Sequence, residues 1–404
     1  MNTFTMAWRN VWRNTRRSIA TIGAMTLALW VMLLHSGLVK GYYDRLERGV
    51  VDLELGDIQI FAPTYQDNPS LFTTIPNSEE VTEAIENSNY PASPRLLGGG
   101  LGASGKFSAG VALRGIELER DRKVSLLPKM VGEGQWLNQK FPLGVVIGKK
   151  LARTLNARVG SELVVLTQAA DGSMANELFD IRGILETISD ATDRRGVIML
   201  ASSFRELMVF PEGVHQIVVR RPDDIELTAA TAAVRKLAPD MDVQSWRQIL
   251  PTIATMLDGA RASIFILYLV IYLAVGILLL NAMLMAVFER IREFGVLKAI
   301  GAGPAKVFSL IFSEAIIQMA LSTALGTILA LPPMWYLSEV GINLGNLGGM
   351  SMMGMSVGSV LYSIYSVETV VPAYTALTII VLLSVLYPAL KAAWIKPIES
   401  MRYQ

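Results

Sequence analysis

The chain has 404 residues, of which 52% are apolar and 18% charged, and its 36 Lys and Arg nearly balance its 35 Asp and Glu. A soluble domain carries about 25% charged residues, so we expect a few segments to hold almost no charge. The balanced charge excludes a strongly basic nucleic-acid surface. With no Cys and two His, the composition also excludes disulfides, thiolate metal sites, a Cys nucleophile and an all-His metal site.

Four long apolar segments satisfy the rule that about 20 nearly uncharged residues span a bilayer. They predict transmembrane helices at 19–39, 262–288, 307–337 and 371–389. The first segment is longer than the apolar core of about 7–15 residues in a signal peptide, and no small-residue cleavage site follows it. We therefore expect it to remain as a membrane anchor.

The distribution of Lys and Arg predicts the orientation of these spans. The segments 1–18, 289–306 and 390–404 are rich in basic residues, whereas the 338–370 segment has neither Lys nor Arg. We therefore expect both termini and the 289–306 segment to lie in the cytoplasm. The 40–261 and 338–370 segments are then external.

The first 18 residues predict an amphipathic helix at the membrane interface. Phe4, Trp8, Val11 and Trp12 fall at helical spacing on one side, with the arginines opposite. Indole rings favour the headgroup level and cations favour anionic lipid, so membrane lipids are the expected partners. A positively charged flank without helical structure is the alternative. The interface residues are Trp8, Trp12, Arg13, Arg16 and Arg17.

The 40–261 segment predicts a mixed α+β domain. Strand patterns occur at 57–61, 109–115 and 216–220, and a hairpin at 162–167 and 177–185 with Asp171-Gly172 in its connection. Helix patterns occur at 201–208, at 225–237 and from Asn77, where Glu80 completes a capping-box-like start. Helical patterning also runs from Trp246 past Pro251 into the second span, which predicts a rigid stalk at 246–261.

A short helix between the second and third spans is bracketed by stop and start signals. Ile291, Phe294, Leu297 and Ile300 share a helical stripe, Gly301 is placed to end the helix, and Pro304 is placed to begin the third span. The short cytoplasmic segments offer this stripe nothing to bury against, so we expect a partner protein to cover it. A helix lying among the lipid headgroups is the alternative.

No catalytic set can be assembled from the remaining polar residues. Gly100 to Lys106 fits the spacing of a phosphate-binding loop, but Phe107 stands where a hydroxyl would bind magnesium, so we interpret the glycines as a flexible hairpin loop. His35 is expected to form an interfacial hydrogen bond, and His215 precedes a strand without a triad signature. We expect no metal site.

Polar residues inside the spans are functional candidates by default. They are Asn281, Glu314 and Gln318. Since no second carboxylate or His lies at a comparable depth, we expect Glu314 to form an interhelical hydrogen bond or to reach the interface, and not to relay protons. The Gly- and Met-rich stretch 341–359 is interpreted either as an adaptable apolar contact surface or as a re-entrant or surface-lying loop.

The run Glu289-Arg-Ile-Arg-Glu-Phe-Gly-Val-Leu-Lys-Ala-Ile-Gly301 resembles the coupling segment of FtsX-like ABC-transporter permeases. This is the superfamily of the macrolide exporter MacB and the lipoprotein-releasing permeases LolC and LolE. The end of the chain is similar to the family's C-terminal signature at Pro388, Ala389, Pro397, Glu399 and Arg402. The order of one span, a large external domain and three further spans also matches.

The resemblance implies an integral membrane α-helical protein with four transmembrane helices and a large α+β periplasmic domain, located in the bacterial inner membrane. The periplasmic domain is expected to comprise a porter-like subdomain, 40–115 and 204–250, around a Sabre-like insertion, 116–203. The residues expected to couple to a separate ATPase subunit are Glu289, Arg290, Arg292, Glu293, Phe294, Gly295, Leu297, Lys298, Ile300 and Gly301.

Partners and activity also follow from the resemblance. A dimer with a second permease copy or a paralogue is expected, with no enzymatic activity or cofactor in this chain, because the partner ATPase binds Mg-ATP. No ATPase domain precedes the first span, which favours the LolC and LolE arrangement over MacB. The hairpin residues Gln168, Asp171 and Met174 fall where LolC docks a periplasmic chaperone, but this hairpin is shorter and lacks proline.

The first expected function is therefore lipoprotein release from the inner membrane. Efflux of peptides or drugs with a periplasmic adaptor is the second. A non-transporting scaffold that regulates envelope hydrolases is the alternative from another class. Force is expected to pass through the stalks to the external domain, because the spans carry too few polar residues to line a hydrophilic path.

Overall fold

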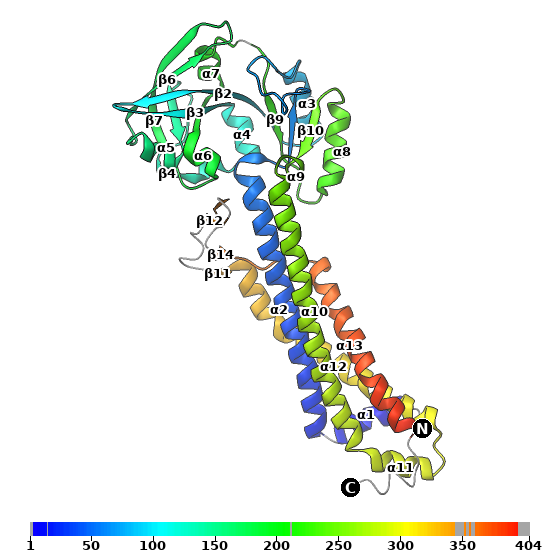
Figure 1. Cartoon of the computed structure of the whole chain (residues 1–404). Helices are drawn as coiled ribbons and strands as arrows, with labels where there is room; N and C mark the ends of the chain where they lie inside the picture. Colours follow the sequence, from blue (N-terminus) through cyan, green and yellow to red (C-terminus); the bar gives the residue numbers. More distant parts are fainter. Residues whose placement is uncertain are drawn as a thin grey trace. The chain divides into compact units, whose positions relative to one another are not determined.

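The computed structural model describes residues 3–13, 15–210, 212–343, 351–352, 355–356 and 360–394. The chain divides into two compact units (Figure 1). The helical unit consists of Met1–Asp44, Asp258–Leu344 and Val360–Gln404, and the sheet unit of Arg45–Leu257 and Gly345–Ser359. Most of the 341–359 stretch lies outside the described residues, so its two interpretations stay open.

Long helices make up the helical unit. Its elements are α1 (Thr3–Arg13), α2 (Thr15–Val50), α10 (Pro251–Phe288), α11 (Ile291–Ala299), α12 (Pro304–Glu339), α13 (Val367–Trp394) and the antiparallel pair β11 (Ile342–Asn343) and β14 (Val360–Leu361). Another short pair, β12 (Ser351–Met352) with β13 (Met355–Ser356), belongs to the sheet unit. Among the described helices, α2, α10, α12 and α13 are long and apolar enough to cross a membrane, in agreement with the four predicted spans.

The long helices share an apolar core. Its buried members include Met25, Leu29, Met32, Leu279, Ile311, Leu377 and Val381. Two glycines one turn apart let the segment after β14 lie against α2, because a Cβ at Gly37 would overlap the ring of Tyr365 and one at Gly41 would overlap the backbone of Tyr362. A side chain at either glycine would push this segment away from α2.

Helix α1 confirms that the N-terminal segment is helical and not an irregular charged flank. Val11 is buried in one cluster with Leu310 of α12, whereas Trp8 and Trp12 stay exposed. The sequence pattern predicts Val11, Trp8 and Trp12 on one side of the helix. In the structure Val11 packs against the protein, and the two indoles remain exposed. The indole rings are therefore free to lie at the headgroup level.

The predicted end of α11 at Gly301 and the predicted start of α12 at Pro304 are also confirmed. Gly301 has φ 97°, a left-handed conformation that glycine adopts without steric cost. Pro304 is the first residue of α12, where its missing N–H removes no helical hydrogen bond. These two residues therefore end one helix and begin the next within a short loop.

A ten-stranded mixed sheet forms the centre of the sheet unit. Its order is β10-β1-β9-β2-β3-β8-β5-β7-β4, with β6 pairing to β2 and β7. The strands are β1 (Ile58–Phe61), β2 (Ala92–Ser104), β3 (Phe107–Ile116), β4 (Val131–Gly134), β5 (Gly144–Ile147), β6 (Glu162–Gln168), β7 (Met174–Leu185), β8 (Gly196–Leu200), β9 (Gln216–Val219) and β10 (Asp242–Ser245).

Short helices connect these strands. They are the π-helix η1 (Val51–Leu55), α3 (Ser78–Asn87), α4 (Leu118–Val124), the 3₁₀-helix η2 (Leu127–Met130), α5 (Lys149–Thr154), α6 (Asp190–Arg195), α7 (Ala201–Leu207), α8 (Leu227–Leu237) and α9 (Trp246–Ile249). Helix α3 begins after Asn77 as predicted, but the predicted cap is wrong. Asn77 is left-handed at φ 48° and its side chain makes no capping hydrogen bond.

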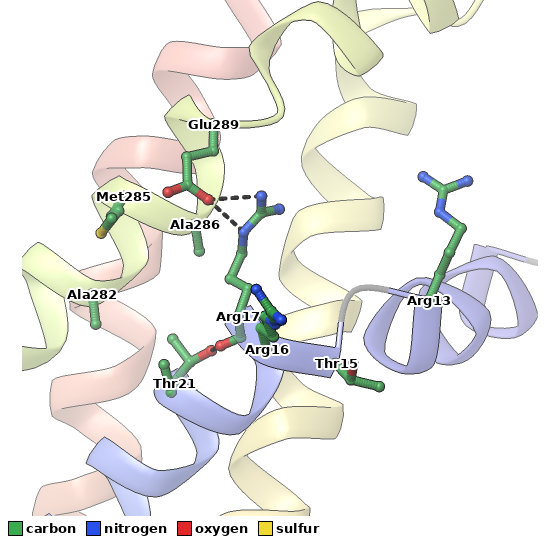
Figure 2. A pocket seen from close by; sticks show the side chains of 10 residues that line it. Arg13, Thr15, Arg16, Arg17, Thr21, Ala282, Met285, Ala286 and Glu289 are labelled. Atoms are coloured by element: carbon green, nitrogen blue, oxygen red, sulfur yellow. Dashed lines mark hydrogen bonds and ion pairs between the residues drawn. The ribbon is translucent and has the colours of Figure 1, made fainter.

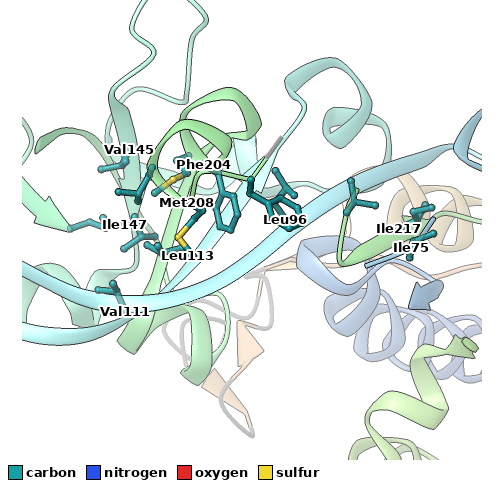
Figure 3. Close-up of a cluster of buried hydrophobic side chains, with 14 of the residues drawn as sticks. Ile75, Leu96, Val111, Leu113, Val145, Ile147, Phe204, Met208 and Ile217 are labelled. Atoms are coloured by element: carbon teal, nitrogen blue, oxygen red, sulfur yellow. The ribbon is translucent and has the colours of Figure 1, made fainter. Parts of the chain in front are cut away.

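One apolar core continues across most of this sheet. Figure 3 shows Phe204 and Met208 facing side chains from several strands. The labelled members from strands are Leu96, Val111, Leu113, Val145, Ile147 and Ile217. Strand β3, which leads into the predicted 116–203 insertion, pairs in parallel with β8, which lies near the end of that insertion, from Ala112↔Gly196 to Ile116↔Leu200. The division of this unit near residues 116 and 204 stays a prediction.

Strand β2 corrects the interpretation of its glycines as a flexible loop. It is a regular strand that pairs with β3 along one edge and with β9 and β6 along the other. A Cβ at Gly100 would come within 2.7 Å of the carbonyl oxygen of Leu166, and one at Gly102 within 2.7 Å of the Val111 side chain. Only the turn residue Gly105 needs its left-handed backbone, with φ 56°. The glycines therefore permit close strand packing.

The predicted hairpin is confirmed as β6 and β7, which pair from Glu162↔Asp180 to Gln168↔Met174. Gly172 in its connection has φ 85°, a conformation that favours glycine. The predicted strands near 57–61, 109–115 and 216–220 correspond to β1, β3 and β9. The helices near 201–208 and 225–237 correspond to α7 and α8.

His215, just before β9, is a buried structural residue. Its Nδ1 accepts the backbone N–H of Leu97 at 3.1 Å, and its Nε2 lies 3.0 Å from the carbonyl oxygen of Leu71. Both bonds are satisfied by the neutral ring with its proton on Nε2. Burial lowers the pKa of His215 because the charged ring would lose its hydration.

We expect protection of the amides of β2 to fall as the pH drops from 7 to 5. Below the ordinary pKa of about 6.5 the unfolded histidine binds a proton while the buried ring stays neutral, so stability is complete above that pH and is lost below it. Hydrogen exchange of the full chain measures the effect. His215→Gln should flatten the pH dependence and His35→Gln should preserve it. An unchanged slope in His215→Gln would contradict this account.

Candidate functional site

Charged side chains converge around the beginning of α11. Arg290, in the turn before α11, contacts both carboxylate oxygens of Glu314 on α12 at 2.7 and 2.6 Å. Its Nε also donates to Glu293 at 3.1 Å, and Glu293 accepts a second bond from Arg13 of α1 at 3.0 Å. The network therefore ties α11 to two neighbouring helices.

The Arg290–Glu314 pair is buried, with 6% and 13% of the two side chains exposed. One nitrogen, Arg290 Nη1, contacts both oxygens of Glu314 while Nε bonds Glu293, so the guanidinium is oriented by two carboxylates. Glu314 thus makes a polar contact to another segment, as expected. Arg290, in contrast, does not lie on an open docking surface.

The expectation that the apolar stripe of α11 lacks an intramolecular partner is wrong for Ile291 and Phe294. Phe294 is 1% exposed and belongs to the core formed with α12 and α13, and Ile291 is also buried. These long helices bury Ile291 and Phe294, a partner that the short loops alone would not supply, whereas Ile300 of the predicted stripe stays exposed. On the other side of α11, Val296 is 53% exposed and Ile300 76%.

The end of α11 is fastened to the end of α13. Lys298 Nζ donates to the carbonyl oxygen of Ala393 at 2.7 Å, at the negative end of the helix dipole of α13. Of the predicted coupling residues, Gly295 and Arg290 are buried, and Arg292 and Ile300 are exposed, as is Val296, which was not among them. The predicted coupling residues therefore divide into an internal set and an exposed set.

The other predicted residues lie apart from α11 in the sequence or along the helices. Pro388 and Ala389 are buried in α13, whereas Pro397, Glu399 and Arg402 lie outside the described residues. Asn281 is exposed on α10, and Gln318 is buried on α12. The part of the chain that the structure describes holds no cluster of three or more His, Cys, Asp or Glu suited to a metal ion.

The β6–β7 turn is held by hydrogen bonds within the turn itself. Asp171 accepts the backbone N–H and the hydroxyl of Ser173 at 2.9 and 2.6 Å. These bonds lower the pKa of Asp171, because they favour the charged carboxylate. Met174 is exposed, so the candidate partner hairpin offers one apolar side chain beside a charge.

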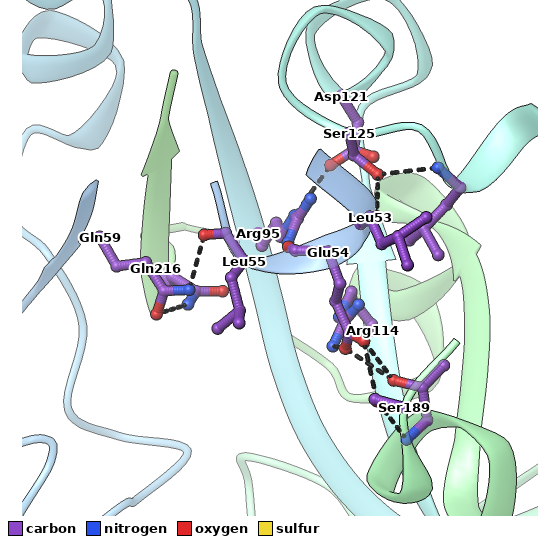
Figure 4. Close-up of polar contacts among 12 residues, drawn as sticks. Leu53, Glu54, Leu55, Gln59, Arg95, Arg114, Asp121, Ser125, Ser189 and Gln216 are labelled. Carbon is purple, nitrogen blue, oxygen red and sulfur yellow. Dashed lines mark hydrogen bonds and ion pairs between the residues drawn. The ribbon is translucent and has the colours of Figure 1, made fainter. Parts of the chain in front are cut away.

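A second polar network, which the sequence analysis missed, surrounds Glu54 in η1 (Figure 4). Its carboxylate pairs with Arg114 of β3 and accepts hydrogen bonds from Ser189 and from Thr192 of α6. Its carbonyl oxygen accepts a bond from Arg95 at 2.6 Å. The end of α2 is therefore bonded to several elements of the sheet unit.

Further bonds reinforce this junction. Arg95 pairs with Asp121 at 2.8 Å, and both side chains are 1% exposed. The π-helix accepts two more bonds through its backbone, from the hydroxyl of Ser125 and the N–H of Leu126. One sequence signal could have indicated the Glu54 network: a carboxylate stands between two apolar residues just before a strand, in Leu53-Glu54-Leu55.

The beginning of α10 is anchored in the same unit by Trp246. This side chain is fully buried in a cluster with Val51, Ala254 and Leu257. Its backbone N–H donates to the carbonyl oxygen of Asp57 at 3.0 Å. The ends of α2 and α10 thus pack against each other within the sheet unit.

Two family models match the chain. The MacB-like periplasmic core domain matches residues 18–237, and the FtsX-like permease C-terminal region matches residues 265–397. The first match covers more than half of the chain, so the protein belongs to the FtsX-like permeases that carry a MacB-like periplasmic core domain. This confirms the resemblance found in the coupling and C-terminal motifs, and makes the chain a membrane component of a transporter family.

Particular relatives are lipoprotein-releasing system transmembrane proteins LolC. The one from Xylella fastidiosa is 24% identical over 302 residues, which cover 72% of this chain and 73% of the relative. The one from Neisseria meningitidis serogroup B is 22% identical over 327 residues, covering 78% of each. The solved periplasmic region of MacB from Actinobacillus actinomycetemcomitans overlaps 51% of this chain and 95% of its own, with 16% identity and a TM-score of 0.37.

The buried Arg290–Glu314 pair yields a stability prediction. Arg290→Met or Glu314→Leu alone should cost about 3–5 kcal/mol, since each leaves an unpaired buried charge, and the double variant should cost much less than the sum. Unfolding midpoints in detergent measure this cycle. Arg13→Met is the matched control: it removes the exposed Arg13–Glu293 pair and should cost about 1 kcal/mol or less. Small, additive losses would show that the pair does not hold α11.

Proposed function

We propose that this chain is the permease subunit of a LolC-type ABC transporter in the bacterial inner membrane. A separate ATPase subunit binds Mg-ATP and docks on α11, and the permease works as a dimer with a second copy or a paralogue. Both termini are cytoplasmic and the sheet unit is periplasmic, with porter-like and Sabre-like parts. Lipoproteins are the proposed cargo, because the LolC relatives cover more than two thirds of the chain.

The observation that carries the proposal is the two-sided construction of α11. One side is locked into the helical unit by Phe294 and Arg290, and the other presents Val296 and Ile300 beside Arg292. An exposed apolar pair rimmed by charge suits a protein contact. Because the inner side is packed, a displacement imposed on the exposed side moves the attached helices as well.

Helices α2 and α10 provide the route outward. Each continues without a break from the helical unit into the sheet unit, where the Glu54 network and the Trp246 cluster hold their ends. The spans hold few polar side chains for a hydrophilic path. We therefore propose that ATP-driven movement reaches the periplasmic domain through these helices, and that cargo does not cross between the spans.

Substitutions on the exposed side of α11 test the docking step. Val296→Asp or Ile300→Asp should weaken copurification of the ATPase subunit at least about tenfold, because a charge would be buried unpaired in the contact. Phe107→Asp, an exposed apolar-to-acid change on the β2–β3 hairpin, is the matched control and should have no effect. Phe294→Asp should instead destabilise the permease itself. Unchanged copurification in Val296→Asp and Ile300→Asp would refute the docking site.

A flexible insertion tests the transmission step. A Gly-Ser segment inserted after Asp258 interrupts α10 where the two units divide, so lipoprotein release should be lost while most ATP hydrolysis remains. The same insertion after Gly105, in the exposed β2–β3 turn, should leave release intact. Release and hydrolysis are measured in proteoliposomes that contain the full complex. Wild-type release from the Asp258 insertion would contradict transmission through α10.

A further inference from the structure

A cavity of about 630 Å³ opens between the beginning of α2 and the end of α10. Arg13, Arg16 and Arg17 line it from one side, and Glu289 from the other (Figure 2). All of these residues belong to the helical unit. We propose that this cavity binds the phosphate headgroup of one anionic phospholipid.

The hydrogen bonds around the cavity leave donors for an anion. Arg17 bonds Glu289 through Nε at 2.8 Å and Nη2 at 2.7 Å, but its Nη1 is buried without a hydrogen-bond partner. Arg16 makes no ion pair with any residue that the structure describes. A buried guanidinium nitrogen without a partner is costly, and a phosphate oxygen is a matching acceptor.

The charge of the surrounding cluster fits a phosphodiester. Arg13 and Arg17 are paired with Glu293 and Glu289, respectively, so Arg16 remains as one uncompensated positive charge. One phosphodiester group carries a single negative charge and restores neutrality. Helix α2 begins at Thr15, and the positive end of its dipole therefore points to the same place.

The rest of the cavity suits a lipid and not a free anion. Beyond the charged residues its wall is formed by Thr15, Thr21, Met285 and the small side chains of Ala20, Ala282 and Ala286, which leave a largely apolar groove between two membrane-spanning helices. An acyl chain can occupy such a groove, whereas inorganic phosphate gains nothing from it. The exposed indoles of Trp8 and Trp12 on α1 are suited to the headgroup level of a bilayer. Basic pockets between transmembrane helices bind anionic headgroups by this combination of contacts.

The binding test uses the purified full-length permease in detergent, without the ATPase. Native mass spectrometry with dioctanoyl phosphatidylglycerol should show one lipid retained per chain, and dioctanoyl phosphatidylcholine should bind at least about tenfold more weakly. Arg16→Gln should raise the dissociation constant for phosphatidylglycerol about tenfold. Arg9→Gln is the matched control, because Arg9 is an exposed cation on α1 outside the cavity, and it should leave the constant within about twofold.

Four results would overturn the proposal. Equal losses in Arg9→Gln and Arg16→Gln would show diffuse attraction to the whole basic segment. Equal binding of phosphatidylcholine would show that the headgroup charge is not recognised. Displacement of phosphatidylglycerol by inorganic phosphate at similar concentration would identify a free-anion site, and absence of any retained lipid would show that the cavity is not a lipid site. Because no ATPase is present, the result is independent of the proposed function.

Discussion

The buried ion pair between Arg290 and Glu314 is the interaction on which the end of the helical unit around α11 depends. It places a charge from the turn after α10 against a charge on α12, in surroundings where neither can remain unpaired. The turn is thereby fixed, and with it the entry of α11. Phe294 then enters the core one turn later. The apolar contacts of Phe294 alone are not directional, so the ion pair is what fixes the orientation of α11.

The same combination of forces recurs at the other end of α2 and α10. There the carboxylate of Glu54 is oriented by Arg114 and Thr192, and Trp246 supplies the buried aromatic surface. Apolar burial provides most of the free energy, but it is not directional. Charged and hydrogen-bonded groups add the direction. Each end of the long helices is therefore both bound and oriented, which is a requirement for passing on a displacement.

Sequence patterns predicted those features that depend on local chemistry. The four spans follow from runs without charge, the end of α11 from Gly301 and Pro304, and the β6–β7 hairpin from Asp171-Gly172. The burial of Phe294 could not be predicted, because helical periodicity identifies an apolar stripe without saying what covers it. Strand β2 was missed for a related reason: its glycines indicate a loop by propensity, yet close contacts across the sheet require them.

The partners of Glu54 and Glu314 were also beyond sequence reasoning, since Arg114 and Arg290 meet them only through tertiary folding. The buried position of Arg290 changes the interpretation of the coupling motif. Within Glu289–Gly301, the residues that resemble the family most visibly serve two different purposes, because Arg290 and Phe294 hold the helix from inside while Val296 and Ile300 face outward. Loss of function from a change at Phe294 would therefore report on folding. Only changes at the exposed residues Val296 and Ile300 can report on a contact with a partner, so substitutions on that side of α11 decide whether the ATPase docks there.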